Sequence, residues 1–334
     1  MADLAARTAP SRVGPERPDP SAEAAPIPLL PEDRPAPAGG PATRARVLEI
    51  RPGTIRERDD LLVAEEPLAI RACGPGQAPV EVAVTMRTPG DEVDLALGFL
   101  FTEGLLDPSE VAAVELGDPG RLARPDDEVT VRLRRPVDLG RIAERRFVAT
   151  AACGICGKAS IDEVVLRVAP PPAGRPIVAA AVVAGLPDRL RLAQPTFRLT
   201  GGLHAAALFR PDGELVAVRE DVGRHNALDK LVGSQLRLGR LPLHDAVLLV
   251  SGRVSFEIVQ KAAAAGIPIV AAVSAPSDLA VEAAARLGMT LVGFVRGGRC
   301  NVYTGAERIR PGAAGLAVAA RPAPPAGPTP RRRR

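Results

Sequence analysis

The sequence contains no tryptophan, and aromatic residues together make up only 2% of it. The core must therefore be filled by aliphatic side chains, which is more typical of an α/β protein than of an aromatic-rich β-sandwich. So few aromatics also argue against a surface that binds single-stranded nucleic acid by base stacking. Apolar residues nevertheless make up 46% of the 334 residues, enough for one large domain or two modest ones.

Cysteine is scarce as well, with only Cys73, Cys153, Cys156 and Cys300. A secreted protein framed by disulfides would be smaller and richer in cysteine. No apolar run reaches the roughly 18 residues that a membrane span requires, and the N-terminus lacks the basic-then-apolar pattern of a signal peptide. We therefore expect a reduced, cytoplasmic protein with no membrane partner.

The body of the chain carries almost no net charge. The formal net charge is +4, and the four arginines at 331–334 alone account for it. The basic pI is therefore weak evidence for a nucleic-acid partner, and a solvated tail is the simpler interpretation.

The composition divides the chain into two tails and an ordered body. Proline, alanine and charged residues without periodicity fill 1–44, and a similar basic stretch fills 317–334. Both segments are expected to be disordered tails. A strand, helix and strand pattern predicts a small α+β domain over 45–147, followed by a mobile cysteine loop at 148–158.

The remaining segment, 159–316, has the pattern of a larger α/β domain. A hairpin is predicted over 203–218, and after it three continuous apolar runs alternate with helical patterns, at 246–250, 268–273 and 290–295. Such runs indicate parallel strands buried on both faces, and ligands bind at the carboxyl ends of such strands. The segments that follow the runs are therefore expected on one rim of the sheet, with helices that begin at Ser251 and Ser274: these segments are 251–253, 274–277 and 296–299.

The cysteine loop holds the most reactive candidate residues. Cys153 and Cys156 lie three apart between glycines, which let a sulfur atom move between partners, and Lys158 favours the thiolate form. A sulfur-accepting thiol, a thioredoxin-type redox pair and half of a zinc site all fit this motif. Zinc usually requires a second Cys/His pair, and the redox motif lacks its βαβ context. Two buried small hydrophobic residues are the simplest alternative, although the glycine and polar neighbours disfavour burial.

Two other clusters suggest an anion site. Arg224 and His225 lie between a predicted strand and a predicted helix, where an N-terminus attracts anions, although a lone histidine is more often structural. Residues 296–299 place two arginines around a glycine pair whose amides can approach a phosphate. An exposed turn has the same sequence, and His204 is either functional or simply the first residue of a strand. Together the clusters suggest a site for a nucleotide pyrophosphate.

Several strings of the sequence resemble, in order and spacing, the formate dehydrogenase accessory sulfurtransferase family. The similarity covers roughly residues 45–315, and the motif at 219–230 combined with the cysteine pair is its most specific part. The strings that carry it are MRTPGD at 86–91, LGFLFTEG at 97–104, CGICG at 153–157, TGGLH at 200–204, REDVGRHNALDK at 219–230, SGR at 251–253 and FVRGGR at 294–299.

This resemblance implies a sulfur carrier of the cytoplasm. A cysteine desulfurase would load Cys153 as a persulfide, assisted by Cys156, and the sulfur would pass to the molybdenum or tungsten bis-pterin guanine dinucleotide cofactor (Mo-bis-MGD) before it enters formate dehydrogenase. The residues expected to bind this cofactor are Phe294, Val295, Arg296, Gly297, Gly298, Arg299, Arg224 and His225.

The resemblance also implies a fold and an assembly. The larger domain is expected to be α/β, with a cytidine-deaminase-like mixed sheet and helices on both faces, and the protein is expected to form a homodimer. Deaminase chemistry is not implied, because the cysteine pair precedes His225 and no metal site of the H-x-E and P-C-x-x-C type is present in the sequence. A thiol–disulfide oxidoreductase and a non-catalytic chaperone for the pterin cofactor are the alternative functions.

Overall fold

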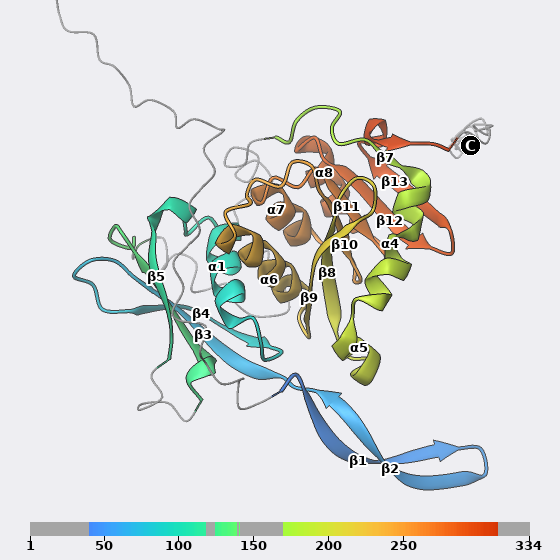
Figure 1. Cartoon of the computed structure of the whole chain (residues 1–334), viewed down its shortest axis with the longest axis horizontal. Helices are drawn as coiled ribbons and strands as arrows, with labels where there is room; N and C mark the ends of the chain where they lie inside the picture. The colour runs from blue at the N-terminus through green and yellow to red at the C-terminus, as the bar shows by residue number, and fades with distance from the viewer. Residues whose placement is uncertain (1–39, 118–123, 139, 141–169, 313–334) are drawn as a thin grey trace, which may run out of the picture.

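The computed structural model describes residues 40–117, 124–138, 140 and 170–312. Figure 1 shows a small domain beside a larger α/β domain, and a two-stranded arm that projects away from both. The expectation of an α/β fold with a mixed sheet, accompanied by a smaller α+β unit, is confirmed. None of the helices in the described ranges is long and apolar enough to cross a bilayer.

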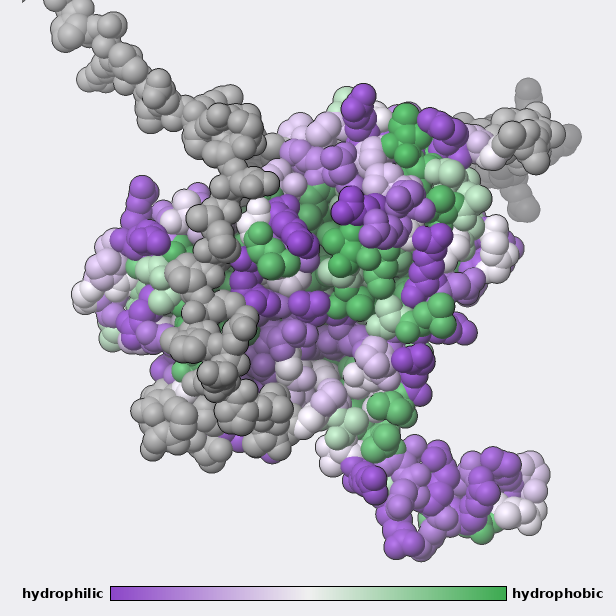
Figure 2. Space-filling view, viewed as in Figure 1, coloured by the Kyte–Doolittle hydropathy of each residue, from purple (hydrophilic) through white to green (hydrophobic). Residues whose placement is uncertain are grey.

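The arm is a hairpin of β1 (Ala42–Arg51) and β2 (Thr54–Val63), paired along their whole length. Pro52 and Gly53 make the turn, and Gly53 has φ +79°, which glycine adopts without strain. β1 begins inside the segment expected to be a tail, because pairing with β2 rather than an apolar pattern defines it. The side of the arm visible in Figure 2 is almost entirely hydrophilic.

The small domain is a four-stranded sheet covered by one helix. The strand order is β4-β3-β6-β5, with β3 and β6 parallel and the other pairs antiparallel. Leu95 and Leu97 of the helix pack into a core with Leu68 and Val131 of the sheet. The elements are β3 (Glu66–Cys73), β4 (Val80–Arg87), α1 (Glu92–Thr102), β5 (Val111–Leu116) and β6 (Glu128–Leu133).

The larger domain is built on a six-stranded sheet with the order β13-β12-β11-β10-β8-β9. The three apolar runs form β10, β11 and β12, which are parallel to one another as predicted. The sheet is mixed because the remaining strands are antiparallel to their neighbours. The strands are β8 (His204–Phe209), β9 (Leu215–Asp221), β10 (Val247–Val250), β11 (Ile269–Ala272), β12 (Thr290–Arg296) and β13 (Arg299–Thr304).

Helices cover both faces of this sheet, because alternate strand residues point to opposite sides. Leu248 belongs to the core beneath α6, α7 and α8, whereas Leu249 belongs to the core beneath α4. The helices are α4 (Ala180–Leu192), α5 (Pro195–Thr200), α6 (Arg224–Arg237), α7 (Phe256–Ala264) and α8 (Asp278–Arg286). Near them β7 (Val178–Ala179) pairs with β14 (Ile309–Arg310).

The two domains are joined where α1 crosses α6. Gly98 of α1 and Gly233 of α6 lie in backbone contact, because a Cβ atom on Gly98 would be 2.9 Å from the Gly233 nitrogen. Two buried ion pairs flank this crossing, Lys261–Asp229 at 2.8 Å on one side and Lys230–Asp221 at 2.8 Å on the other. The close approach fixes the small domain against the middle of α6, the helix whose first residue, Arg224, belongs to the candidate site.

Candidate functional site

The carboxyl ends of the parallel strands lie side by side, as their topology requires. The Val254 amide donates to the Ala275 carbonyl at 3.1 Å, and the Ser277 amide donates to the Val254 carbonyl at 2.9 Å. The Phe294 amide in turn donates to the Ser274 carbonyl at 3.0 Å. The structure therefore brings the segments after β10, β11 and β12 together into one rim.

The expected starts of the two helices on this rim are wrong. The N-cap of α7 is Ser255 and that of α8 is Ser277, because a parallel bridge between Val254 and Pro276 keeps both segments extended beyond the strands. Ser251 has a different role, since its hydroxyl oxygen accepts a hydrogen bond from the Ala205 amide at 2.9 Å. This bond ties the end of β10 to the start of β8.

Residues 294–299 form the β12–β13 hairpin at one end of the rim. Gly297 and Gly298 have φ values of +59° and +74°, the pair of positive angles that a type I′ turn requires. The ordinary turn requirement thus explains the glycine pair. Val295 is fully buried in the core, so its side chain lies away from the rim. Phe294 has φ +52°, and the Arg296 guanidinium lies 5.4 Å from the centre of its ring.

Arg224 begins α6 at the other end of the rim. The N-cap residue, Gly223, supplies no side-chain hydrogen bond to the helix, and the Arg224 Nε is buried with no hydrogen-bond partner among the described residues. The Nε atoms of Arg71, Arg87 and Arg219 also lack hydrogen bonds, but each of those guanidiniums pairs with a carboxylate. Arg224 is therefore a half-buried cation left without an anion by the described part of the chain.

His204 lies beside Arg224, at the start of β8. A Cβ atom added to Gly252 would lie 3.2 Å from the His204 Nδ1, so the glycine allows the loop after β10 to approach the ring. Burial, together with the nearby Arg224 and Arg253, lowers the pKa of His204, against the opposing effect of Asp221. The lowered pKa favours the neutral form of this imidazole.

His225 is held between α6 and α7. Its Nε2 lies 3.0 Å from a carboxylate oxygen of Glu257 and 3.2 Å from the hydroxyl of Ser255. A carboxylate partner fixes the orientation of an imidazole ring. No sequence signal pointed to Ser255 or Glu257, because they lie about thirty residues from His225 and meet it only through helix packing.

The sulfur chemistry expected at Cys153 and Cys156 falls in a segment that lies outside the described residues. The other two cysteines are described: Cys73 is buried, with the Arg132 Nη1 at 3.5 Å from its sulfur, and burial raises the pKa of the half-buried Cys300. Over the described ranges, no group of three or more His, Cys, Asp or Glu side chains is arranged to hold a metal ion.

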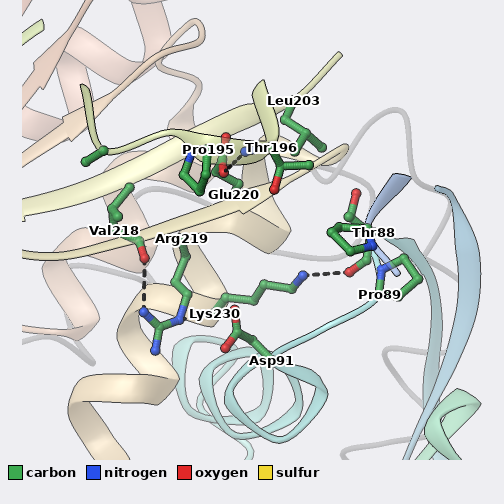
Figure 3. Close-up of a pocket in the computed structure, with 12 residues that line it drawn as sticks. Thr88, Pro89, Asp91, Pro195, Thr196, Leu203, Val218, Arg219, Glu220 and Lys230 are labelled. Carbon is green, nitrogen blue, oxygen red and sulfur yellow. Dashed lines mark hydrogen bonds and ion pairs between the residues drawn. The ribbon is translucent and has the colours of Figure 1, made fainter. Parts of the chain in front are cut away.

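A cavity that the sequence did not indicate lies between the two domains. Its volume is about 290 Å³, and it is lined by Thr88 and Asp91 of the small domain and by Pro195, Arg219 and Lys230 of the larger one (Figure 3). The charged groups around it already have partners: Arg219 pairs with Asp91 at 3.4 Å, Lys230 pairs with Asp221 at 2.8 Å, and the Glu220 carboxylate accepts hydrogen bonds from two backbone amides. The cations that line the cavity are therefore already paired with carboxylates of the protein.

Fold and site together define an α/β protein with a mixed sheet, an attached α+β domain and a rim of arginine and glycine residues at the strand ends. The chain belongs to the FdhD/NarQ family, whose model matches residues 63–310. The family resemblance inferred from the motifs is thereby confirmed.

Individual relatives agree with this assignment. The chain is 52% identical over 274 residues to a sulfur carrier protein FdhD of Streptomyces coelicolor. This alignment covers 80% of this chain and 95% of the relative. It is 49% identical over 287 residues to the protein of the same name from Nocardia farcinica, covering 84% and 100%. A crystal structure from Desulfotalea psychrophila, named as a formate dehydrogenase accessory protein, matches with a TM-score of 0.61 and 27% identity, over 80% of this chain and 99% of that one.

Proposed function

We propose that this protein is a sulfur carrier that supports the maturation of formate dehydrogenase. The names of its relatives favour this role, and the observation that carries the proposal is the rim. Arg224, Arg253, Arg296 and Arg299 all belong to segments that meet the strand ends of one sheet. A cationic rim of this kind suits a phosphate-bearing cofactor as the recipient of the sulfur.

In the proposed reaction, Cys153 acts as the sulfur acceptor in the cytoplasm. Its thiolate attacks the outer sulfur of a cysteine desulfurase persulfide, a new S–S bond forms to Cys153, and the desulfurase cysteine leaves as a thiolate. The exchange involves no net oxidation or reduction. Lys158 favours the attacking thiolate, the glycines at 154 and 157 let the segment turn toward the rim, and Cys156 assists.

The recipient is the Mo-bis-MGD cofactor, bound as a substrate. From β8 to β12 the rim crosses three strand spacings, or about 15 Å, a length that suits an extended ligand with phosphate groups. Arg296 and Arg299 would bind phosphate at one end and Arg224 at the other. Phe294 offers an aromatic face beside Arg296, Gly297 and Gly298 offer backbone amides, and Val295 contributes only its backbone.

The sulfur-carrying step is tested by mass spectrometry of the full chain after incubation with a cysteine desulfurase and cysteine. Sulfur should be added to the wild type and absent from Cys153→Ala. Cys300→Ala is the matched control, because it removes a half-buried thiol elsewhere and should leave the added sulfur unchanged. Equal sulfur loading of Cys153→Ala and the wild type would refute the assignment.

The same variants separate the carrier from a chaperone that only shields the cofactor. In cells that lack the accessory protein, Cys153→Ser should fail to restore formate oxidation if sulfur is carried, because the hydroxyl cannot hold a persulfide. Normal formate oxidation with this variant would instead support the chaperone, and insulin reduction that depends on both loop cysteines would support an oxidoreductase.

We also propose that the protein is a homodimer. Leu48, Ile50 and Ile55 lie near the end of the arm with 62%, 73% and 68% of their surface exposed. All three project from the same face of the hairpin, because Ile50 is paired with Ile55 and Leu48 lies two residues away. An isolated two-stranded hairpin with an uncovered apolar face is marginally stable in water. A second copy that covers this face would remove the exposure.

A further inference from the structure

We propose that His204, Arg224 and Arg253 form an anion-binding subsite for a phosphate group, separate from residues 294–299. This inference rests on the proposed function in one respect, because it concerns how the cofactor is held. It adds two residues, His204 and Arg253, and it places one phosphate of the ligand at the β8–β10 end of the rim.

The three residues come from different elements that meet beside Gly252. His204 begins β8, Arg224 begins α6, and Arg253 follows β10. Gly252 is the contact between them: a Cβ atom there would lie 3.2 Å from the His204 Nδ1 and 3.7 Å from the Arg224 Cδ. The ring and the arginine stem therefore border the same glycine. From β10 to β12 the rim crosses two strand spacings, which separates this point from the β12–β13 turn by about 10 Å.

The subsite carries positive charge that the described protein does not neutralise. Arg224 has no hydrogen bond or ion pair among the described residues, and the exposed Arg253 lies close enough to influence the His204 ring. Asp221 is the nearby carboxylate, and its oxygens are already used by Lys230 at 2.8 Å and by the Thr88 and Gly223 amides at 3.1 Å and 2.8 Å. The N-terminus of the 14-residue α6, which no side chain caps, adds favourable backbone dipoles for an anion.

The pKa of His204 should change when an anion binds to the subsite. Three charged groups act on the ring: Arg224 from α6, Asp221 from β9 and Arg253 after β10. Because burial and the two arginines lower the pKa of His204 in the free protein, a bound phosphate group should raise it again and draw a proton onto the ring. A dianionic phosphate that accepts hydrogen bonds from two guanidiniums and one imidazolium fits the three donors better than a carboxylate, which has only two oxygens.

Isothermal titration of the full chain with inorganic pyrophosphate, GDP and guanosine tests the subsite at constant ionic strength. Pyrophosphate and GDP should bind, guanosine should not, and Arg224→Gln and Arg253→Gln should each weaken binding of both anions by about tenfold, the loss of one charge-assisted contact. Arg210→Gln is the matched control, because it removes the same charge at the other end of β8, where Arg210 pairs with the exposed Glu214. It should leave the affinities unchanged.

Binding that is unaffected in both Arg224→Gln and Arg253→Gln, or equally reduced in Arg210→Gln, would overturn the proposal. Arg253 is exposed, so its variant keeps the test decisive even if Arg224→Gln fails to fold. A second readout is the pKa of His204, followed by NMR and assigned with His204→Asn among the three histidines. Pyrophosphate should raise it, and an unchanged pKa would also refute the subsite. Neither measurement involves sulfur, so failure here is distinguishable from failure of Cys153 to carry it.

Discussion

The crossing of α1 and α6 makes the most sharply defined prediction, the effect of Gly98→Ala on stability. A Cβ atom at position 98 would lie 2.6 Å from the Asp229 carbonyl carbon and 2.9 Å from the Gly233 nitrogen, and both neighbours are backbone. The Asp229 carbonyl oxygen would lie closer still. Non-bonded carbon atoms pack best at about 3.5–4.0 Å, so the two helices must separate by more than about 1 Å. No side-chain rotation can relieve this contact.

The magnitude follows from two opposing effects. Overpacking of this kind costs about 3 kcal/mol, while alanine in place of glycine inside a helix contributes about 1 kcal/mol of stability. The net loss is about 2 kcal/mol, which for a protein of this size lowers the Tm by about 4–8 °C. Thermal unfolding followed by circular dichroism measures it.

Gly185→Ala is the matched control for this substitution. Gly185 also lies inside a helix, α4, but a Cβ atom there would meet no atom within 4 Å. Its variant should therefore be more stable than the wild type, by about 0.5–1 kcal/mol. If Gly98→Ala raised the Tm as Gly185→Ala does, the argument from backbone contact would be refuted.

Four other predictions follow from buried or exposed groups. Lys261→Met should lower the free energy of unfolding by about 3–5 kcal/mol, because it leaves the buried Asp229 without its cation. Denaturant titration measures this loss. Recovery of stability in the double variant Lys261→Met with Asp229→Leu would confirm the cause. Burial opposes the charged form of Lys261, but Asp229 and a neighbouring carboxylate outweigh it and raise the pKa of Lys261. The stabilisation from this ion pair should therefore be present below pH 10.5 and be lost at more alkaline pH. Lys261→Met should not show this alkaline loss of stability. Burial raises the pKa of Cys300, so iodoacetamide should modify it more slowly in the folded chain than in urea at pH 8, as peptide mass spectrometry can check; equal rates would contradict this. Ile50→Lys should shift the protein toward the monomer in light scattering, and an unchanged mass would argue against the arm as the dimer contact.

The sequence by itself determined the parts of the fold that depend on local periodicity. The apolar runs identified β10, β11 and β12, and their alternation with helices placed the three following segments on one rim. The amphipathic pattern likewise indicated a helix between the strands of the small domain, and this helix is α1. These elements could be found because each is defined by neighbours a few residues away.

Only the tertiary structure decided features that depend on residues far apart in the chain. The strand β1 exists because β2 pairs with it, and the helix starts expected at Ser251 and Ser274 were wrong because a bridge between Val254 and Pro276 extends both segments. Likewise Arg224 was a candidate from its place before a helix, but only the tertiary structure showed that it has no anionic partner among the described residues. Burial and pairing are properties of distant contacts, which a local pattern does not contain.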